Sequence, residues 1–411
     1  MNKRIRYFII ENGDDMKRRI QDMDVRNKRV LLRCDFNVPV KDGVILDDSK
    51  IVASLNTIDY LVKEGARIII LSHFGKVKTE EDKAKNSLAP VAAHLQKLVN
   101  TKVIFSKQAR SLYLEAKIEN MNPGEILVLE NTRFEDVPNK LESGNDTQLA
   151  MYWAGLADVF CLDAFGSSHR KHASTYGVAK YLPSCIGYLV QREVSMLDQY
   201  VLRAERPFTI VMGGAKVEDK VELIESLLPR CDHLLLTGGI ANSCLATLGF
   251  NVGSSLRTKD PEVLDKIKEL LIQYKDKIML PVDAIISRVY NETLVEHVNI
   301  DKVNDDDIIL DIGIKTINKY KDVINSSKTI FVNGTAGKYE DVRFATGTRE
   351  MLENIVNSKA IKIVGGGDGV SAAKHFKLGE HFTFLSTGGG ATLEYIINEG
   401  LPAINNIPDA K

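Results

Sequence analysis

The sequence predicts a doubly wound α/β fold in two halves. Short, continuous apolar segments rich in Ile, Leu and Val recur along the chain, as in strands buried on both faces of a parallel sheet. Segments with helical periodicity separate them, which favours alternating strands and helices. The expected strands are Arg29–Phe36, Arg67–Leu71, Ile126–Leu129, Val159–Leu162, Phe208–Met212, His233–Leu236, Thr329–Val332, Ile361–Val364 and Thr383–Leu385.

The expected helices also place the domain boundary. Val217, Val221, Ile224 and Leu228 recur at spacings of 4, 3 and 4, which predicts a helix. A second helix is expected over 189–206, ended by Pro207, and it would connect the domains. We therefore expect an N-terminal domain over 1–188, the connecting helix, a C-terminal domain over 207–403 and a tail over 404–411 that can return to the first domain. The charged stretch 76–86 is expected to be a solvated loop.

Composition excludes several classes of protein. The chain has 411 residues, 44% hydrophobic and 27% charged, which is typical of a globular protein. Lys plus Arg number 54 and Asp plus Glu 55, so a general binder of nucleic acid or membrane surfaces is not expected. The five cysteines are odd in number and form no C-x-x-C pair, which favours a reducing compartment. No apolar segment approaches the roughly 20 residues of a membrane span, so we expect a cytoplasmic protein.

Basic and polar residues follow the expected strands of the first half. Ligands of open α/β sheets bind beyond the carboxyl ends of strands, so these side chains should converge on one edge. Clustered cations need an anion, and Arg offers bidentate donors to phosphate or carboxylate. We expect a small acid with several negative charges, with Asp35 and Asn37 suited to its hydroxyl group; unrelated surface charges are the alternative. The basic side chains are His73, Lys76, Arg133, His169 and Arg170, with Arg33 inside the first strand.

The pair His169-x-x-His172 could place two metal ligands on one helical face. No third His, Cys or carboxylate stands at the spacing of a zinc site. We therefore do not expect a zinc site there.

Glycine turns follow the expected strands of the second half. In G-G-A-K-V-E-D-K, Lys216 and Lys220 are four residues apart, so both should share one helical face and form a phosphate site with the helix N-terminus. In G-G-G-D, the bare backbone admits phosphates and Asp368 could hold Mg²⁺ on them. Tight structural turns are the alternative. Neither a Walker motif nor the G-x-G-x-x-G of a dehydrogenase is present.

Motifs that occur in order from about Lys28 to Ile407 carry a family resemblance. They are V-L-L-R-C-D-F-N-V-P, L-S-H-F-G-K, L-A-P-V-A, L-E-N-T-R-F, D-A-F-G-S-S-H-R, G-G-A-K-V-E-D-K, L-P-V-D, V-N-G-T-A-G-K-Y-E, G-G-G-D and S-T-G-G-G-A. In this order the chain resembles the phosphoglycerate kinases. The resemblance implies two Rossmann-like, doubly wound parallel-sheet domains facing each other across a cleft. It also implies transfer of a phosphoryl group between 1,3-bisphosphoglycerate and ADP, with Mg²⁺, giving 3-phosphoglycerate and ATP.

The resemblance assigns roles to particular residues. The matches to the acid-binding pattern are Arg33, Asp35, Phe36, Asn37, Lys50, His73, Phe74, Gly75, Lys76, Arg133 and Arg170. The matches to the nucleotide-binding pattern are Gly214, Lys216, Lys220, Gly238, Gly239, Asn333, Glu340, Gly365, Gly366, Gly367, Asp368 and Gly369. Glu340 would bind the ribose hydroxyls, Asp368 the metal, and Lys216 and Lys220 the phosphates. Lys50, Lys216 and Lys220 would be catalytic, stabilising the phosphoryl group in transit without a covalent intermediate. A monomer with small-molecule partners is expected, whose closure would bring the two substrates together.

The chain departs from the family pattern at a few positions. Lys50 and Lys76 stand where the family usually has Arg, and Gly369 stands where it usually has Thr or Ser. Thr335-Ala336 replaces the usual Pro-Val. Lys keeps the charge but loses the fork of donors. An alternative therefore stays open: a degenerate paralogue that binds nucleotide and a phosphorylated acid with weak or no turnover.

Overall fold

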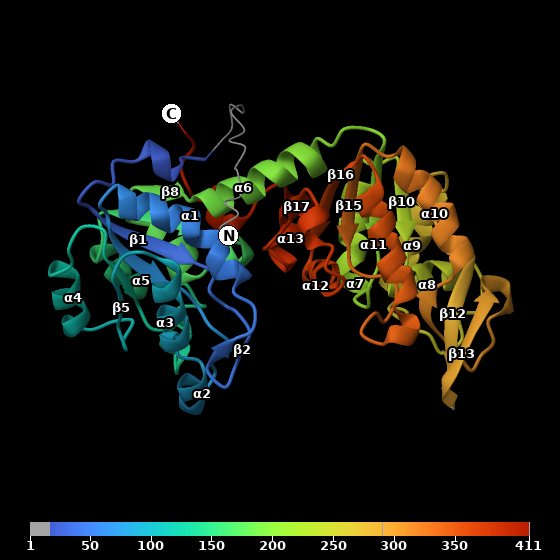
Figure 1. Cartoon of the computed structure of the whole chain (residues 1–411), viewed down its shortest axis with the longest axis horizontal. Coiled ribbons are helices and arrows are strands. Elements are labelled where there is room, and N and C mark those ends of the chain that lie inside the picture. The colour runs from blue at the N-terminus through green and yellow to red at the C-terminus, as the bar shows by residue number, and fades with distance from the viewer. Residues whose placement is uncertain (1–16, 290, 411) are drawn as a thin grey trace. The chain divides into compact units, whose positions relative to one another are not determined.

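The computed structural model describes residues 17–289 and 291–410. They form two compact units, one of residues 17–195 with 400–410 and the other Met196–Glu399 (Figure 1). The chain passes from the first unit to the second within helix α6 (Tyr188–Leu197), which continues as a π-helical turn over Asp198–Leu202. The connecting helix thus ends at Leu202 and not at Arg206 as expected.

The first unit is built on a six-stranded parallel sheet in the order β5-β6-β4-β1-β7-β8. Its strands are β1 (Arg29–Cys34), β4 (Arg67–Leu71), β5 (Val103–Phe105), β6 (Ile126–Val128), β7 (Val159–Asp163) and β8 (Ser184–Ile186), with a hairpin of β2 (Val40–Lys41) and β3 (Val44–Ile45). Its other helices are α1 (Ser49–Lys63), α2 (Glu80–Lys85), α3 (Ala89–Leu98), α4 (Leu112–Glu119), α5 (Thr147–Gly155) and α14 (Pro402–Asn405). Helices lie on both sides of the strands (Figure 1).

The second unit has a six-stranded parallel sheet in the order β11-β10-β9-β15-β16-β17. Its strands are β9 (Phe208–Met212), β10 (His233–Leu236), β11 (Ile278–Met279), β15 (Thr329–Asn333), β16 (Ile361–Gly365) and β17 (Phe384–Leu385). Its helices are α7 (Glu218–Leu227), α8 (Gly238–Thr247), α9 (Pro261–Gln273), α10 (Ile314–Ser326), α11 (Thr346–Asn357), α12 (Gly367–His375) and α13 (Gly390–Asn398). This is the Rossmann strand order, whose switch point lies here between β9 and β15.

The predicted α/β fold with two parallel-sheet units is confirmed. The mainly apolar strands were placed correctly, since segments such as β4 and β9 are almost entirely buried. The expectation missed an antiparallel sheet in the order β13-β12-β14. Its strands are β12 (Asp283–Arg288), β13 (Asn291–Asn299) and β14 (Asp307–Ile312).

The stretch 76–86, expected to be a solvated loop, contains helix α2. The Thr79 hydroxyl accepts a hydrogen bond from the backbone nitrogen of Asp82, and the Asp82 carboxylate accepts one from the backbone nitrogen of Thr79. This reciprocal cap stabilises the first turn of a helix. The segment is therefore helical although none of the residues of α2 is buried.

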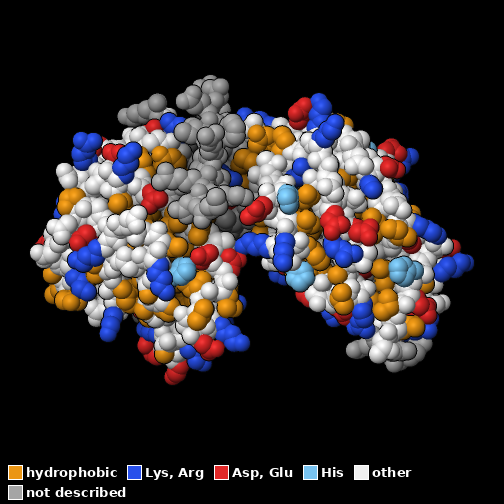
Figure 2. Space-filling view, viewed as in Figure 1, with side chains coloured by type: hydrophobic (Ala, Val, Ile, Leu, Met, Phe, Trp, Pro, Cys, Tyr) orange, Lys and Arg blue, Asp and Glu red, His pale blue; other side chains and the backbone are white. Residues whose placement is uncertain are grey.

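Charged side chains of both signs are interspersed over the visible face of each unit, in line with the net charge of −1 (Figure 2). Among the described residues, no helix combines the length and the apolar character needed to cross a membrane.

A buried carboxyl group caps helix α6 in the first unit. Asp163 ends β7, and its Oδ1 accepts hydrogen bonds from the backbone nitrogens of Leu189 at 3.0 Å and Val190 at 3.3 Å. Its Oδ2 is buried without a hydrogen-bond partner among the described residues. Burial raises the pKa of Asp163 to about 7, although hydrogen bonds from Thr57 and the helix N-terminus favour the charged form.

This pKa predicts a pH-dependent stability. Between pH 4 and pH 7 folded Asp163 holds a proton that the unfolded chain has lost, so its ionisation lowers the free energy of unfolding as the pH rises through that range. The variant Asp163→Asn should remove this loss, gaining on the order of 4 kcal/mol relative to the parent between pH 4 and pH 8. Urea unfolding at both pH values checks this, followed by the fluorescence of Trp153, the single tryptophan, which is buried in the first unit.

The exposed Asp42→Asn serves as a control and should show no such pH-dependent gain. A parallel pH response in the parent and in Asp163→Asn would contradict the prediction.

Candidate functional site

The carboxyl edge of the first sheet gathers charged residues from neighbouring strands. β1 lies between β4 and β7, so residues that follow β1 and β4 meet at one edge. Asp35 follows β1 and His73 follows β4, and both are buried. Helix α1 adds Lys50 near its start, with its Nζ 2.9 Å from Asp35 Oδ2. Arg33 Nη2 lies 3.2 Å from His73 Nδ1.

Asp35 is ionised despite its burial. Burial alone would raise the pKa of its carboxyl group, but the charge and the hydrogen bond of Lys50, together with the charge of Arg33, help to lower that pKa to about 2. Lys50 is partly exposed, with 32% of its side chain accessible. The ion pair therefore has a closed, acidic side and a cationic side that faces solvent.

The remaining first-half residues extend this edge. The Asn37 side-chain oxygen accepts a hydrogen bond from the backbone nitrogen of Gly75 at 2.9 Å, and Arg133 Nη1 donates to the Gly75 carbonyl. Burial and then repulsion by Arg170 lower the pKa of Arg133. Two guanidinium groups that repel each other indicate a place where an anion is favoured.

Other predicted residues lie outside this contact network. Arg170 is exposed and its Nε donates to His169 Nε2 at 2.9 Å. Lys76 is exposed, and its ammonium has no ion-pair partner among residues 17–289 and 291–410. Phe36 and Phe74 are buried in the hydrophobic core, so they offer little ring surface to a ligand.

The glycine turns of the second half meet at the switch point of the second sheet. Gly214 follows β9 with φ +94°, and a Cβ at Gly238 would lie 2.7 Å from the Gly214 backbone nitrogen, so two glycines are needed for the turns to touch. The Gly239 backbone nitrogen donates to the Gly214 carbonyl at 3.0 Å. Asn333, at the end of β15, donates through Nδ2 to the Gly365 carbonyl at 3.0 Å. These contacts bring the ends of four elements together.

The two lysines of the first glycine turn differ in environment. Helix α7 begins at Glu218, so Lys216 precedes it and the expectation that Lys216 and Lys220 share one helical face is wrong. Lys216 is exposed, whereas Lys220 is buried and its Nζ donates to Asn333 Oδ1. Lys216 is therefore available to a ligand, while Lys220 is tied to the end of β15.

The third glycine turn opens helix α12. Asp368 lies in the first turn of α12 and is exposed. Gly369 is buried, and a Cβ there would lie 3.0 Å from Val364 Cγ1 and 3.3 Å from the Gly334 backbone nitrogen. A side chain at this position would require its neighbours to move, so the local packing suits glycine.

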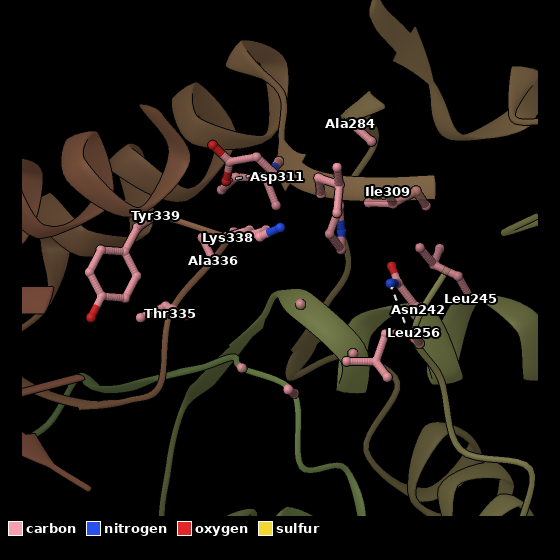
Figure 3. A pocket seen from close by; sticks show the side chains of 18 of the residues that line it. Asn242, Leu245, Leu256, Ala284, Ile309, Asp311, Thr335, Ala336, Lys338 and Tyr339 are labelled. Carbon is pink, nitrogen blue, oxygen red and sulfur yellow. Dashed lines mark hydrogen bonds between the residues drawn. The ribbon is translucent and has the colours of Figure 1, made fainter. Parts of the chain in front are cut away.

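A cavity of about 360 Å³ opens beside these turns within the second unit. Its lining includes the predicted residues Gly214, Gly238, Gly239, Glu340 and Asp368. Its apolar wall was not predicted, since Leu245, Leu256, Ala284 and Ile309 come from segments without a motif. Lys338 was also missed, and Figure 3 shows its ammonium directed toward Ile309 and Asn242. An apolar slot beside a glycine-rich turn is suited to a nucleotide, whose base is flat and whose phosphates need backbone donors.

The two histidines of the His169-x-x-His172 pair contact different residues. His172 Nδ1 lies 3.8 Å from Glu142 Oε1, whereas His169 Nε2 accepts a hydrogen bond from Arg170. Burial, followed by the charge of Arg33, lowers the pKa of His172 to about 3. In the described part of the chain, no group of three His, Cys, Asp or Glu residues is arranged to hold a metal ion.

Comparison with known proteins identifies the family. A sequence model described as "Phosphoglycerate kinase" matches residues 20–399. The chain is 44% identical over 392 residues to a phosphoglycerate kinase of Lacticaseibacillus casei, covering 95% of this chain and 98% of that one. It is 44% identical over 396 residues to that of Macrococcus caseolyticus, covering 96% and 100%. The structure of phosphoglycerate kinase from Coxiella burnetii superposes with a TM-score of 0.83 at 36% identity, covering 95% of this chain and 98% of that chain.

Two doubly wound units and these relatives place the chain among the phosphotransferases with a carboxyl group as acceptor. The chain belongs to the phosphoglycerate kinase family.

Proposed function

We propose that this chain catalyses the reversible transfer of a phosphoryl group between 1,3-bisphosphoglycerate and ADP, giving 3-phosphoglycerate and ATP, a step of glycolysis. The observation that carries the proposal is the 44% identity over 95% of the chain to an enzyme of that name. Two features of the molecule support it. The cationic edge of the first sheet suits a phosphorylated acid, and the cavity beside the glycine turns suits a nucleotide.

Catalysis in this proposal is positioning and charge stabilisation by the chain's own groups. Lys50 and Arg133 would hold the acid, Lys216 would neutralise charge on the phosphoryl group in transit, and Glu340 at the cavity would bind the ribose. Lys220, through its bond to Asn333, would fix the turn that donates backbone N–H groups to the phosphates.

The residues of the second unit fit a bound Mg²⁺. Asp368 is an exposed carboxylate that lines the cavity near Gly214. Mg²⁺ usually takes one or two carboxylates and completes its shell with phosphate oxygens and water, so a single Asp is sufficient. Asp368 would hold the ion, and bound Mg²⁺ would neutralise charge on the phosphate oxygens.

A coupled assay tests the function directly. ATP formation that depends on both ADP and 1,3-bisphosphoglycerate is expected from purified protein. The alternative, a degenerate paralogue, receives no support from the comparisons. Tight binding of both ligands with no ATP formed would nevertheless establish it.

The same proposal includes small-molecule partners, a monomeric state and a cytoplasmic location. The five cysteines support the location, because all are buried free thiols and such groups persist in a reducing compartment.

The division of labour between the units gives a further prediction. Asp368→Ala should weaken binding of Mg-ADP and leave binding of 3-phosphoglycerate nearly intact, because Asp368 lies in the second unit. Arg133→Ala should do the reverse, with losses of roughly tenfold or more for the affected ligand. Calorimetry of both variants with both ligands measures this. If each variant lost both ligands equally, the assignment of one ligand to each unit would be wrong.

A further inference from the structure

Arg33, expected to bind the acid, is enclosed in the protein. Its side chain is 0% exposed. Nε donates to Ser174 Oγ at 2.8 Å, Nη1 donates to the Cys34 carbonyl, and Nη2 lies 3.2 Å from His73 Nδ1. A guanidinium group with these partners and no exposed surface does not touch a ligand. Its contact with the site runs through His73.

Glu142 balances the charge of Arg33 from the far side. Glu142 is completely buried, and both of its oxygens are bound to Ser174, one by the Ser174 hydroxyl and the other by its backbone nitrogen at 2.9 Å. Burial lowers the pKa of Arg33, and the charge of Glu142 is the largest of the effects that oppose this. Glu142, Ser174 and Arg33 therefore form one connected polar chain behind His73.

The contact with Arg33 decides which nitrogen of His73 carries the proton. A guanidinium group only donates hydrogen bonds, so His73 Nδ1 must accept. The neutral ring then carries its proton on Nε2, the nitrogen that points away from Arg33. Protonation of Nδ1 would set an N–H group against an N–H group inside the protein.

The positive charges around His73 also favour the neutral form of its ring. It faces Arg33 from β1, Lys50 from α1 and Arg133 from the turn after β6, with Asp35 as the opposing anion. Burial, together with the three cations, lowers the pKa of His73 well below 6.5 although Asp35 favours the charged form.

From this geometry we propose that Arg33 and Glu142 are positioning residues that hold His73 as a neutral Nε2–H donor to the acid substrate. His73 then gives the substrate a hydrogen bond and no positive charge. The proposal rests on the proposed function for the identity of the ligand, but the state of the ring is a property of the free chain. Its test can therefore fail or succeed independently of turnover.

Two-bond ¹H–¹⁵N spectra of the full, ligand-free, ¹⁵N-labelled chain measure the ring state, with His73→Gln used to assign the signal. Between pH 5.5 and 8, we expect His73 to show a protonated Nε2 and an unprotonated Nδ1 that do not titrate. A ring protonated on Nδ1, or one that becomes an imidazolium within this range, would overturn the proposal. This measurement needs no variant of Arg33 to fold.

Binding of 3-phosphoglycerate by calorimetry provides the second readout. His73→Gln keeps an N–H group near the position of Nε2 and should bind within a few-fold of the parent, whereas His73→Leu should lose roughly 10-fold or more. Rescue by His73→Lys but not by His73→Gln would show a cationic role and overturn the proposal.

Arg33→Lys removes the fork that reaches His73. This variant should bind 3-phosphoglycerate less tightly, and its affinity should vary with pH more than that of the parent, since Nδ1 of the released ring can take up a proton. Glu142→Gln should shift the same pH profile, while the exposed control Glu119→Gln should match the parent. Parental pH profiles in both Arg33→Lys and Glu142→Gln would show that the chain behind His73 has no positioning role.

Discussion

Lys216→Ala is expected to lower turnover by roughly 10- to 150-fold, the equivalent of one charge-assisted hydrogen bond of about 1.5–3 kcal/mol. Lys216 is exposed beside the glycine turn that follows β9, and its ammonium has no ion-pair partner in the part of the chain that the structure describes. Its removal should therefore leave the free energy of unfolding of the second unit unchanged. Steady-state kinetics together with urea unfolding measure the two effects separately.

The matched control for this substitution is Lys268→Ala. Lys268 is an exposed lysine on α9, remote in sequence from the glycine turns, and its variant should keep parental kinetics. Lys220→Ala is a less direct probe, because Lys220 is buried and bonded to Asn333, so its loss should also lower stability. Parental turnover in Lys216→Ala would mean that the turn is structural only.

Lys50→Ala and Lys50→Met should each lower turnover by at least about tenfold. In the proposed reaction Lys50 holds both the acid and the phosphoryl group in transit, so a neutral side chain of either length fails. Lys50→Arg should be tolerated or slightly activating, because Arg restores the fork of donors usual in the family. Turnover at saturating concentrations of both substrates is the measurement.

The contact with Asp35 separates this prediction from a simple surface role. Lys50 Nζ lies 2.9 Å from Asp35 Oδ2, so the lysine is held at the edge of the sheet where the other basic residues gather. Lys63→Met changes an exposed lysine at the other end of the same helix and should be silent. If both neutral Lys50 variants turned over at the parental rate, the prediction would be wrong, and another cation would have the catalytic role assigned to Lys50.

Burial explains which strands could be predicted. The central strands are largely apolar on both faces because helices cover both sides of each sheet, so β4 and β9 appear in the sequence as mainly apolar runs. The sheet of β12, β13 and β14 is antiparallel, and β13 alternates between exposed and partly buried residues, so it carries no such run. The residue types over 293–299 do not alternate, because Val295 is exposed and Glu296 is partly buried, so periodicity could not reveal this strand.

The sequence likewise predicts the position of some site residues but not the burial of others. Residues that follow a strand could be placed at a sheet edge from topology alone, as for His73 and Asp368. The burial of a charged side chain could not be predicted in this manner. Arg33 and Lys220 are both buried, and each has a hydrogen-bond partner far along the chain, Ser174 at 141 residues and Asn333 at 113 residues. The apolar wall of the cavity was missed for the same reason, since its residues converge only after the second unit has folded.

The return of residues 400–410 to the first unit affects the order in which the units can be completed during translation. The Pro408 carbonyl accepts a hydrogen bond from the Arg18 backbone nitrogen at 2.8 Å, and the Ala403 backbone nitrogen donates to the Ser168 carbonyl at 3.0 Å. These closing residues leave the ribosome only after all of Met196–Glu399. The second unit, which is continuous, therefore has its whole chain available before the first, reversing the usual N-terminal-first sequence. While the nascent chain is still emerging, the surface of the first unit that this segment later covers therefore stays uncovered.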